Sequence, residues 1–250
     1  MEIIVLKLSV TNCFLIKAKR KYILVDTGYE YDWDLFCKRL KEAAVSLHEI
    51  SHIILTHHHD DHCGLLNKVL EVNCNIIVVM SHRARELLLK GENDRTHGGG
   101  LINKRIKFLL GLKQIYVSIV LKKKVKKEDN LKFPPYKARE NDILISGEKR
   151  LDEIGILLNG KLIETPGHST DDISIVFDDG DCIVGDAAAN FLRFAGTKYC
   201  VVFVTDIDEY YCSWEKLISQ NARRIFPAHG KLFLAEKLVK NIGRNKTLVN

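Results

Sequence analysis

Residues 56–64, which read THHHDDHCG, concentrate side chains that bind metal ions. Four such side chains lie within six positions, directly after the apolar run 53–55: His57, His59, Asp61 and His62. Imidazole nitrogen and carboxylate oxygen suit zinc, with iron and manganese as second choices. A solvated His-rich loop or a tag would not follow an apolar strand so directly. The stretch therefore predicts a metal site, and with it metal-assisted chemistry.

Three further candidate ligands each follow an apolar segment and a tight turn. His168 follows residues 161–164 in the turn TPGHS, Asp186 follows Gly185 after residues 182–184, and His229 follows residues 223–225 in the turn FPAHG. Taken singly, each is more typical of a helix cap or a surface residue. Each has the form of a strand, a turn and a polar side chain at the strand's end.

In this order, the four segments resemble the ligand pattern of the metallo-β-lactamase superfamily, which opens with His-x-His-x-Asp-His, as at residues 57–62. The resemblance implies two divalent metals, zinc first, with iron or manganese as alternatives. His57, His59 and His168 would hold the first metal, Asp61, His62 and His229 the second, and Asp186 would bridge both. His58 and Asp60 occupy variable positions of the motif, and we expect them to point away from the metals.

Asp26, in the sequence VDTG at residues 25–28, also matches a superfamily motif. In the family this residue orients a ligand histidine and thereby sets the tautomer of its ring. The alternative, which we weigh equally, is a simple turn residue after the strand 22–25. Cys63 lies beside His62 but not at a ligand position, so we expect a small buried apolar side chain there.

The chemistry that the resemblance implies depends on two cations about 3.5–4 Å apart. A water shared between them loses a proton near neutral pH, because both charges stabilise hydroxide. The bridging hydroxide attacks an electrophilic carbon or phosphorus while one metal polarises the substrate oxygen. We assign Asp61 as the catalytic residue that holds the proton or passes it on as the leaving group departs.

The elements that must position these residues follow from the spacing of the apolar side chains. We expect helices near 32–46, 61–71 and 208–220, and strands near 2–8, 12–18, 21–26, 52–55, 76–79, 161–164, 172–177, 181–185 and 200–205, with one more before His229. Together with the resemblance, this order predicts an α+β fold, the αββα four-layer sandwich of the metallo-β-lactamase type.

Residues 83–150 exceed what a minimal version of this fold requires. We interpret them as a basic, partly helical insertion in a single domain that spans 1–250. The segment holds 18 Lys and Arg against 8 Asp and Glu, so it carries all of the chain's net charge of +6. We expect it to flank or cover the active site, with Gly98–Gly100 as a hinge and Arg95 and His97 near the opening. For the run 122–127 (KKKVKK), we favour a solvated surface over a steering role.

Composition limits the class of protein to which the chain can belong. Hydrophobic residues make up 46% of the chain, which is ample for a core, and no apolar run approaches the ~18 residues needed to cross a membrane. The N-terminus lacks the pattern of a secretory signal, and the seven cysteines include no Cys-x-x-Cys pair. We therefore expect a cytoplasmic protein with free thiols, a small-molecule substrate and no membrane partner. The sequence does not indicate the oligomeric state.

We predict a binuclear metallo-hydrolase that cleaves an ester, thioester or lactone. Within the superfamily, the chain resembles glyoxalase II and the N-acyl homoserine lactonases, and it departs from each pattern at one point. Glyoxalase II carries a C-terminal helical domain for which we expect no room after His229. The lactonases place a tyrosine shortly after the bridging carboxylate, whereas Asp186 is followed by AAANF.

Several alternatives stay open. The first is a phosphodiesterase or nuclease whose anionic substrate binds the basic insertion, an affinity that would fall steeply with salt. β-Lactam hydrolysis and single-iron persulfide dioxygenation are others. A flavodiiron protein is disfavoured, because those proteins have Glu at the position of His59. A non-catalytic module is disfavoured, because all seven ligands are present.

Overall fold

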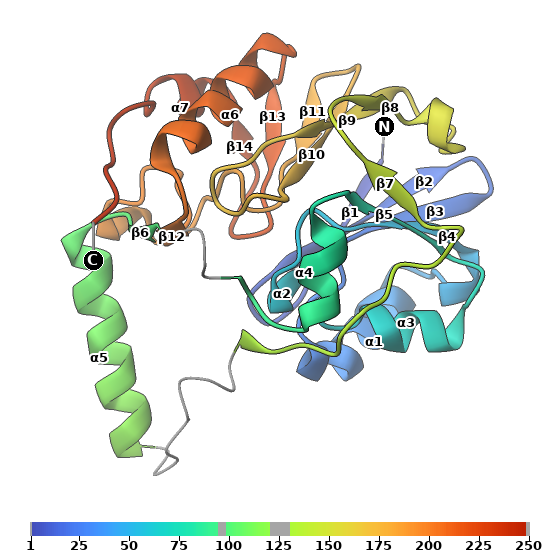
Figure 1. The fold of residues 1–250 in the computed structure, drawn as a ribbon, viewed down its shortest axis with the longest axis horizontal. Coiled ribbons are helices and arrows are strands. Elements are labelled where there is room, and N and C mark those ends of the chain that lie inside the picture. The colour runs from blue at the N-terminus through green and yellow to red at the C-terminus, as the bar shows by residue number, and fades with distance from the viewer. Residues whose placement is uncertain (1, 95–98, 121–130, 249–250) are drawn as a thin grey trace.

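Two six-stranded sheets face each other in the computed structural model, which describes residues 2–94, 99–120 and 131–248, without the side chains of 113–120 (Figure 1). The first sheet has the order β1 (Ile3–Lys7), β2 (Asn12–Ala18), β3 (Lys21–Val25), β4 (Ile50–Ile54), β5 (Ile77–Ser81) and β7 (Ile143–Ile145). The second has the order β14 (Phe233–Leu234), β13 (Arg224–Phe226), β11 (Asp181–Ile183), β10 (Ile173–Phe177), β9 (Gly160–Glu164) and β8 (Lys149–Arg150). A separate ribbon pairs β6 (Gly100–Leu101) with β12 (Phe203–Val204).

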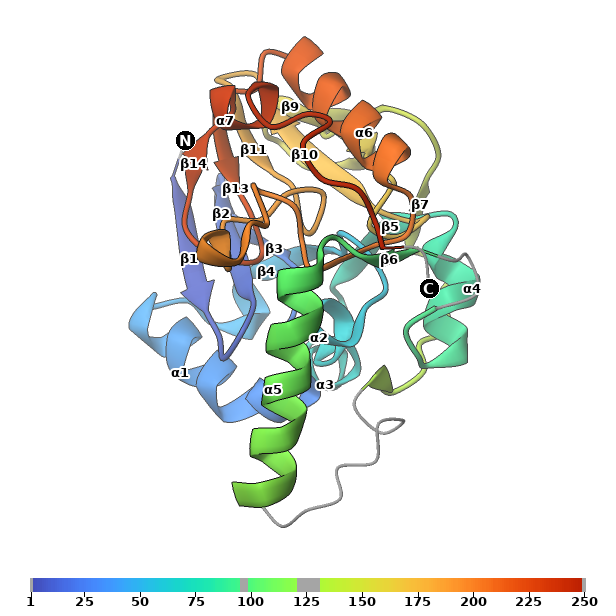
Figure 2. The same cartoon turned by 90° about the vertical axis from the view of Figure 1, so that its left-hand side faces the viewer.

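Helices cover the outer faces of both sheets (Figures 1 and 2). The first sheet carries α1 (Trp33–Glu42), α3 (Leu66–Val72) and α4 (Ala84–Lys90), and the second carries α6 (Ile207–Ser219) and α7 (Glu236–Val239). The short α2 (Asp60–Cys63) follows β4, and α5 (Lys104–Val120) extends away from the two sheets. The predicted αββα four-layer sandwich is confirmed.

Alternating side chains of the strands build separate layers of core. On β2 and β3, Ile16 and Ile23 belong to the buried cluster between the sheets, whereas Leu15 and Leu24 belong to the cluster under the helices of the first sheet. This alternation is the two-residue period of a strand that is covered on both faces. On the second sheet, the fully buried Trp214 of α6 packs in a third cluster.

Strand directions bring the important chain segments to one edge of each sheet. β3 and β4 are parallel, so both end at the same edge of the first sheet. β10 is antiparallel to both β9 and β11, and β11 is parallel to β13, so β9, β11 and β13 run in one direction. The segments that follow β4, β9, β11 and β13 are the ones in which the sequence places its candidate ligands, and Asp26 follows β3.

Some elements differ from the sequence predictions. The helix expected over 61–71 is two helices, α2 and α3, because Cys63 forms a β-bridge with Gly28 and fixes the first turn against the end of β3. The strand expected over 200–205 shrinks to β12, since only Phe203 and Val204 find a partner strand.

The segment 83–150 is not wholly an addition to the core. β7 pairs with β5 in the first sheet, and β8 pairs with β9 in the second, so the core resumes before residue 150. Arg95, His97, Gly98 and the lysine run 122–127 lie outside the described residues.

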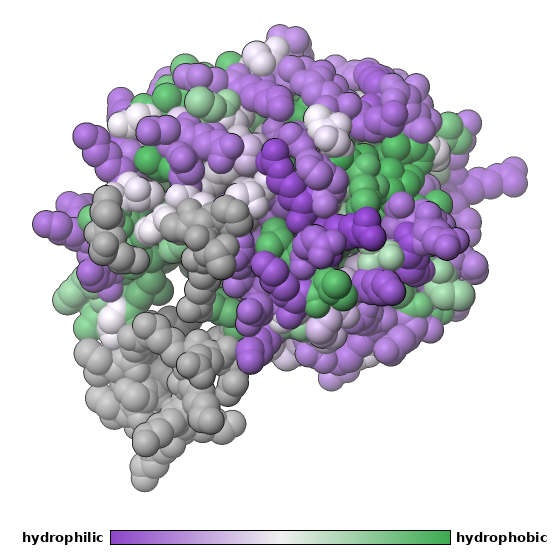
Figure 3. All heavy atoms as spheres, viewed as in Figure 1, coloured by the Kyte–Doolittle hydropathy of each residue, from purple (hydrophilic) through white to green (hydrophobic). Residues whose placement is uncertain are grey.

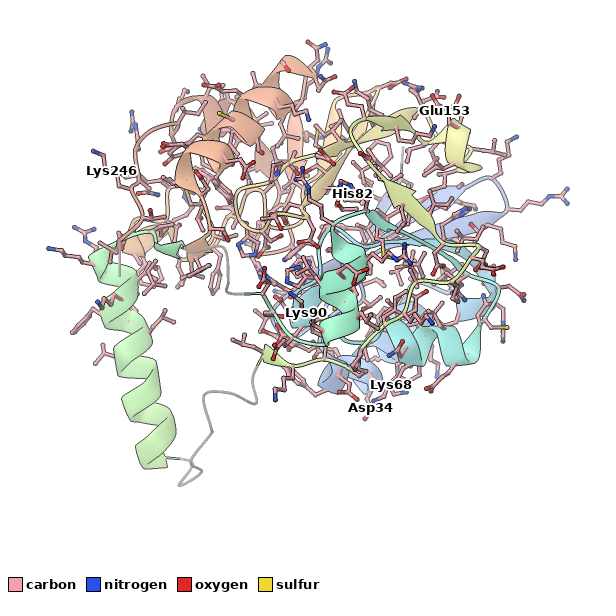
Figure 4. All side chains as sticks on the ribbon, in the orientation of Figure 1. Asp34, Lys68, His82, Lys90, Glu153 and Lys246 are labelled. Carbon is pink, nitrogen blue, oxygen red and sulfur yellow. The ribbon has the colours of Figure 1, made fainter. Side chains whose placement is uncertain are left out.

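The outer surface is mainly polar on the face of Figure 3. Figure 4 shows the charged residues Asp34, Lys68, Glu153 and Lys246 at the periphery, away from the junction of the two sheets. Among the described residues, no helix combines the length and apolar character that a membrane span needs.

Candidate metal centre

All seven predicted ligands meet at the junction of the two sheets. Their nitrogen and oxygen atoms form three overlapping groups, within each of which the atoms lie no more than 4.8 Å apart. The groups are His57, His59 and His168; His57, His62 and Asp186; and Asp61, His62 and His229. Two of the ligands, His57 and His59, lie between β4 and α2, and two, Asp61 and His62, lie in α2. The other three follow β9, β11 and β13.

Asp186 lies between the two halves of this cluster. Its Oδ2 is 3.4 Å from Nε2 of His168, and its Oδ1 is 3.3 Å from Nε2 of His229. Oδ1 is also 3.7 Å from Nε2 of His62. One carboxylate therefore faces histidines of both predicted sites.

Asp26 orients His62. Its Oδ2 is 2.8 Å from Nδ1 of His62, and its two oxygens accept the backbone N–H and the hydroxyl of Thr56. Asp26 itself has a left-handed backbone, with φ 59°. A proton on Nδ1 leaves Nε2 of His62 free for the cluster. The contact favours the orienting role over the simple turn.

Other histidines have similar partners for Nδ1. The ring of His57 lies 3.4 Å from Asp172, that of His168 donates to the carbonyl of Phe203 at 2.9 Å, and that of His229 lies 3.3 Å from the carbonyl of Val10. Each contact fixes a ring so that its Nε2 faces the cluster.

The donor set fits divalent metal ions. Two buried ring nitrogens at the centre, Nε2 of His57 and Nε2 of His62, have no hydrogen-bond partner among the described residues. A buried unpartnered nitrogen costs about 1–3 kcal/mol, and a bound cation would satisfy it. Nitrogen and carboxylate donors in these numbers suit zinc, iron or manganese.

Burial keeps the first group of histidines neutral. It lowers the pKa of His57 and of His59 well below the usual value, and neighbouring imidazoles lower it further. Burial also lowers the pKa of His168. A neutral imidazole is the form that binds a metal.

Carboxylates raise the pKa values of the two histidines in the group of Asp61, His62 and His229. Burial alone would lower the pKa of His62, but the carboxylates of Asp61 and Asp26 outweigh it and raise that pKa to about 9. For His229, Asp186 and Asp61 likewise outweigh burial and raise the pKa well above its usual value. This side of the centre therefore stabilises positive charge, as a site for a cation must.

Comparison with known proteins shows the family to which the chain belongs. The sequence profile of the metallo-beta-lactamase superfamily matches residues 6–229. The chain belongs to this superfamily.

A "Beta-lactamase-like protein 2 homolog" of Caenorhabditis elegans is 25% identical over 244 residues, which are 93% of this chain. The Drosophila melanogaster protein of the same name is 33% identical over 79 residues, which are 30% of this chain. The chain spans only 59% of the worm protein's length, and its match covers 23% of the fly protein's length.

Solved structures of the superfamily share the fold. A metallo-beta-lactamase family protein from Thermus thermophilus aligns with a TM-score of 0.65 at 15% identity, over 97% of this chain and 78% of its own. BJP-1, a subclass B3 metallo-beta-lactamase of Bradyrhizobium japonicum, aligns with a TM-score of 0.61 at 19% identity, over 91% of this chain and 74% of its own. These structures show the fold that membership of the superfamily implies, and the histidine–aspartate cluster of this chain lies at the junction of its two sheets.

A cavity of about 210 Å³ opens onto the candidate metal centre. Four of the candidate ligands line it: Asp61, His168, Asp186 and His229. Its other walls are largely apolar and consist of Val10, Tyr29, Ala189, Phe191, Thr197, Cys200, Val201, Val202 and Phe203. None of the described residues within 83–150 lines the cavity, so the expected flank or lid is not part of its described wall.

His58 and Asp60 belong to none of the three ligand groups. Nδ1 of His58 lies 2.8 Å from Asp171, and its Nε2 accepts the backbone N–H of Asp94. Asp60 and Asn93 exchange two hydrogen bonds. Both variable positions of the superfamily motif thus hold the metal loop against its surroundings.

Three residues near the superfamily centre escaped the sequence analysis: Tyr29, Asp171 and Asp172. The acidic pair follows His168 by only three and four positions, a spacing that could have drawn attention to it. Tyr29 follows the Asp26-Thr27-Gly28 turn, at the same sheet edge as the metal loop.

Proposed function

We propose that the chain is a binuclear metal-dependent hydrolase that cleaves a neutral ester, thioester or lactone. The cavity carries this proposal: it joins the candidate ligands to apolar walls and has no Lys or Arg among its described lining residues. An apolar wall suits an acyl group, whereas a phosphodiester would find no cationic side chain in the described wall to supplement the metals.

His57, His59 and His168 would hold one divalent metal, Asp61, His62 and His229 the other, and Asp186 would contact both. Zinc suits these donors best, with iron or manganese as alternatives. When bound, the two cations supply a water molecule that deprotonates near neutral pH and polarise the scissile carbonyl.

Asp61 is the proposed proton carrier. Its Oδ2 accepts the hydroxyl of Thr11 at 2.9 Å and lies 3.2 Å from Nε2 of His229. These contacts hold the side chain in place and leave Oδ1 to take up a proton and return it to the leaving group. Burial opposes ionisation, but His62 and His229 outweigh it and lower the pKa of Asp61, so the side chain is ionised near neutral pH.

A phosphodiesterase or nuclease is the alternative. Its cationic contacts would have to come from the lysine run 122–127 or its neighbours, outside the described cavity wall. The name of the worm and fly relatives adds β-lactams to the substrates worth testing.

The test is a substrate panel with the metal-loaded protein at low and high salt. We expect turnover of 4-nitrophenyl acetate, a thioester or a lactone, with little dependence on salt. Bis(4-nitrophenyl) phosphate and a chromogenic β-lactam are the competing substrates. Turnover of the phosphodiester alone, falling steeply with salt, would overturn the proposal.

A further inference from the structure

Tyr29 lies in the wall of the cavity that opens onto the metal centre. It comes two residues after Thr27, beyond the end of β3, and lines the cavity together with Asp61, His168 and Asp186. The cavity wall contains two hydroxyl groups that can donate a hydrogen bond, the phenol hydroxyl of Tyr29 and the hydroxyl of Thr197. Tyr29 has no part in the ligand groups.

The backbone on both sides of Tyr29 is fixed against the helix that carries Asp61. The backbone N–H of Thr27 donates to the carbonyl of His62 at 2.7 Å, and Gly28 forms a β-bridge with Cys63. On the other side, a Cβ on Gly64 would lie only 2.5 Å from the backbone nitrogen of Glu30. This close packing places the tyrosine relative to the metal loop without a flexible link.

The ring is held as well as the backbone. The rings of Tyr29 and Tyr31 stack with centroids 4.8 Å apart and an interplanar angle of 15°. Tyr29 is only partly exposed, whereas Tyr31 is 71% exposed and does not line the cavity. Stacking limits the orientations that the phenol can adopt in the cavity wall.

The hydroxyl of Tyr29 is an unused donor. Thr197 donates its hydroxyl to the carbonyl of Phe191 at 2.7 Å, and Cys200 contacts Tyr211 and Asn245. Within the described part of the chain, the hydroxyl of Tyr29 has no hydrogen-bond partner. Burial raises its pKa well above the usual value, and Asp61 and Asp60 raise it further, so it keeps its proton near neutral pH.

We propose that Tyr29 is a substrate-contacting residue whose hydroxyl donates a hydrogen bond to the carbonyl oxygen of the bound ester, thioester or lactone. This assignment rests on the proposed hydrolase function. The proton stays on Tyr29 throughout, and no bond to the tyrosine forms or breaks. The carbonyl oxygen gains negative charge as the carbon is attacked, so the hydrogen bond strengthens in the transition state.

The test compares Tyr29→Phe with Tyr31→Phe. Both variants lose one hydroxyl and keep the stacked rings, but only the first changes the cavity wall. We expect Tyr29→Phe to lower kcat/KM for neutral esters by about 100-fold, mainly through kcat, the lower end of what an oxyanion donor contributes. Metal content should equal that of the wild type, and Tyr31→Phe should keep wild-type kinetics. Loss of metal from Tyr29→Phe would overturn the assignment, because the residue would then support the metal loop.

A binding measurement separates this inference from the hydrolase proposal. A trifluoromethyl ketone with an apolar tail adds water reversibly and presents an oxygen that mimics the attacked carbonyl. Calorimetric titration of the metal-loaded proteins should show about 10-fold weaker binding to Tyr29→Phe than to the wild type. Equal ketone affinity and equal kcat/KM would overturn the role of Tyr29 alone. A wild type that turns over no ester, thioester or lactone would instead overturn the hydrolase proposal.

Discussion

At the scale of single residues, the centre separates atoms that orient from atoms that are free to bind. His62 receives a carboxylate on Nδ1, whereas His168 receives a backbone carbonyl. A carboxylate partner makes the ring a stronger donor than a carbonyl does, because it stabilises the positive charge that the ring gains on a metal. His62 and His168 should therefore respond differently to loss of their outer partners.

His59→Ala tests the ligand assignment directly. We expect the purified wild type to hold about two equivalents of transition metal per chain, as two-metal sites of this kind do. The variant should lose most of the metal of the first site, and activity with it, because one of three predicted nitrogen donors is gone. Elemental analysis of protein purified without chelator provides the measurement. The exposed His48 is the matched control, and His48→Ala should keep full metal content. Full turnover by His59→Ala would rule out the assignment.

Asp26→Asn tests the orienting contact. The amide oxygen can still accept the backbone N–H of Thr56, but the charge beside Nδ1 of His62 is lost, so we expect about 10- to 100-fold weaker binding of one metal equivalent. Competition with a chromogenic chelator measures the affinity. Asp34→Asn, on the exposed face of α1, should bind metal like the wild type. Unchanged affinity in Asp26→Asn would return this residue to the role of a simple turn.

At the scale of elements, the metal loop is placed by close packing of backbone on backbone. Gly64 ends α2, where a Cβ would meet the backbone atoms of Glu30, Asp60 and Gly28 at 2.5–2.8 Å. No side chain can move aside to relieve these contacts. The turn after β3 and the helix that carries two ligands therefore form one unit.

Gly64→Ala should push α2 away from the turn after β3. We expect it to lower the free energy of unfolding by about 1–3 kcal/mol, the usual cost of an overpacked site, and to weaken metal binding at the same time. Gly111→Ala in α5 is the matched control, since a Cβ there meets nothing within 4 Å. The control should be neutral or more stable by up to about 1 kcal/mol. Urea unfolding of both variants measures the difference, and equal stability of Gly64→Ala and the wild type would contradict the prediction.

A second unit joins the segment before β7 to the first sheet. Asp142 accepts hydrogen bonds from Tyr136 and Arg139, and its carboxylate also accepts the backbone N–H of Val78 on β5. Arg139 in turn donates to the carbonyl of Ile76. These contacts attach residues 136–142, which precede β7 in the chain, to the neighbouring strand β5.

Asp142→Asn should destabilise the protein in a pH-dependent way. Burial opposes ionisation, but the hydrogen bonds from Arg139 and Tyr136 outweigh it and lower the pKa of Asp142. A lowered carboxyl pKa contributes stability that is complete above the unfolded value, about 3.9, and is lost as pH falls through the folded value. We expect the variant to be less stable by about 1–3 kcal/mol at pH 7 and the two proteins to converge below about pH 4. Urea unfolding across this range checks it, and a constant difference would exclude the ionised carboxylate as the cause.

At the scale of the whole molecule, the metal centre connects two halves that otherwise share an apolar interface. Each half has one buried cluster under its own helices, and a further cluster lies between the sheets. The first sheet supplies His57 to His62, and the second supplies His168, Asp186 and His229. A bound cation would therefore link both sheets at one edge.

Removal of metal should accordingly lower the stability of the entire fold. At a free-metal concentration 100 times the Kd, binding contributes about 2.7 kcal/mol per site, so a chelator that removes both metals should lower Tm by roughly 10–20 °C. Differential scanning calorimetry with and without chelator measures this, and added zinc should restore the wild-type Tm. His59→Ala should show a smaller shift than the wild type. A chelator effect of the same size in both proteins would mean that the metal binds elsewhere.

The sequence alone determined which residue types gather and which elements carry them. The His-x-His-x-Asp-His pattern and the apolar periods are local, so they predicted the metal loop and the turns that end in His168, Asp186 and His229, and with the family resemblance they predicted the sandwich. Partnerships across the fold depended on the tertiary structure. His59 and His168 are 109 positions apart, and the contact of Asp26 with His62, the roles of Asp171 and Asp172, and the place of Tyr29 all depend on strands that pair only after folding. The physical reason is that a side chain's type is written in the chain, whereas its neighbours are set by the register and direction of distant strands and by the close packing of their ends.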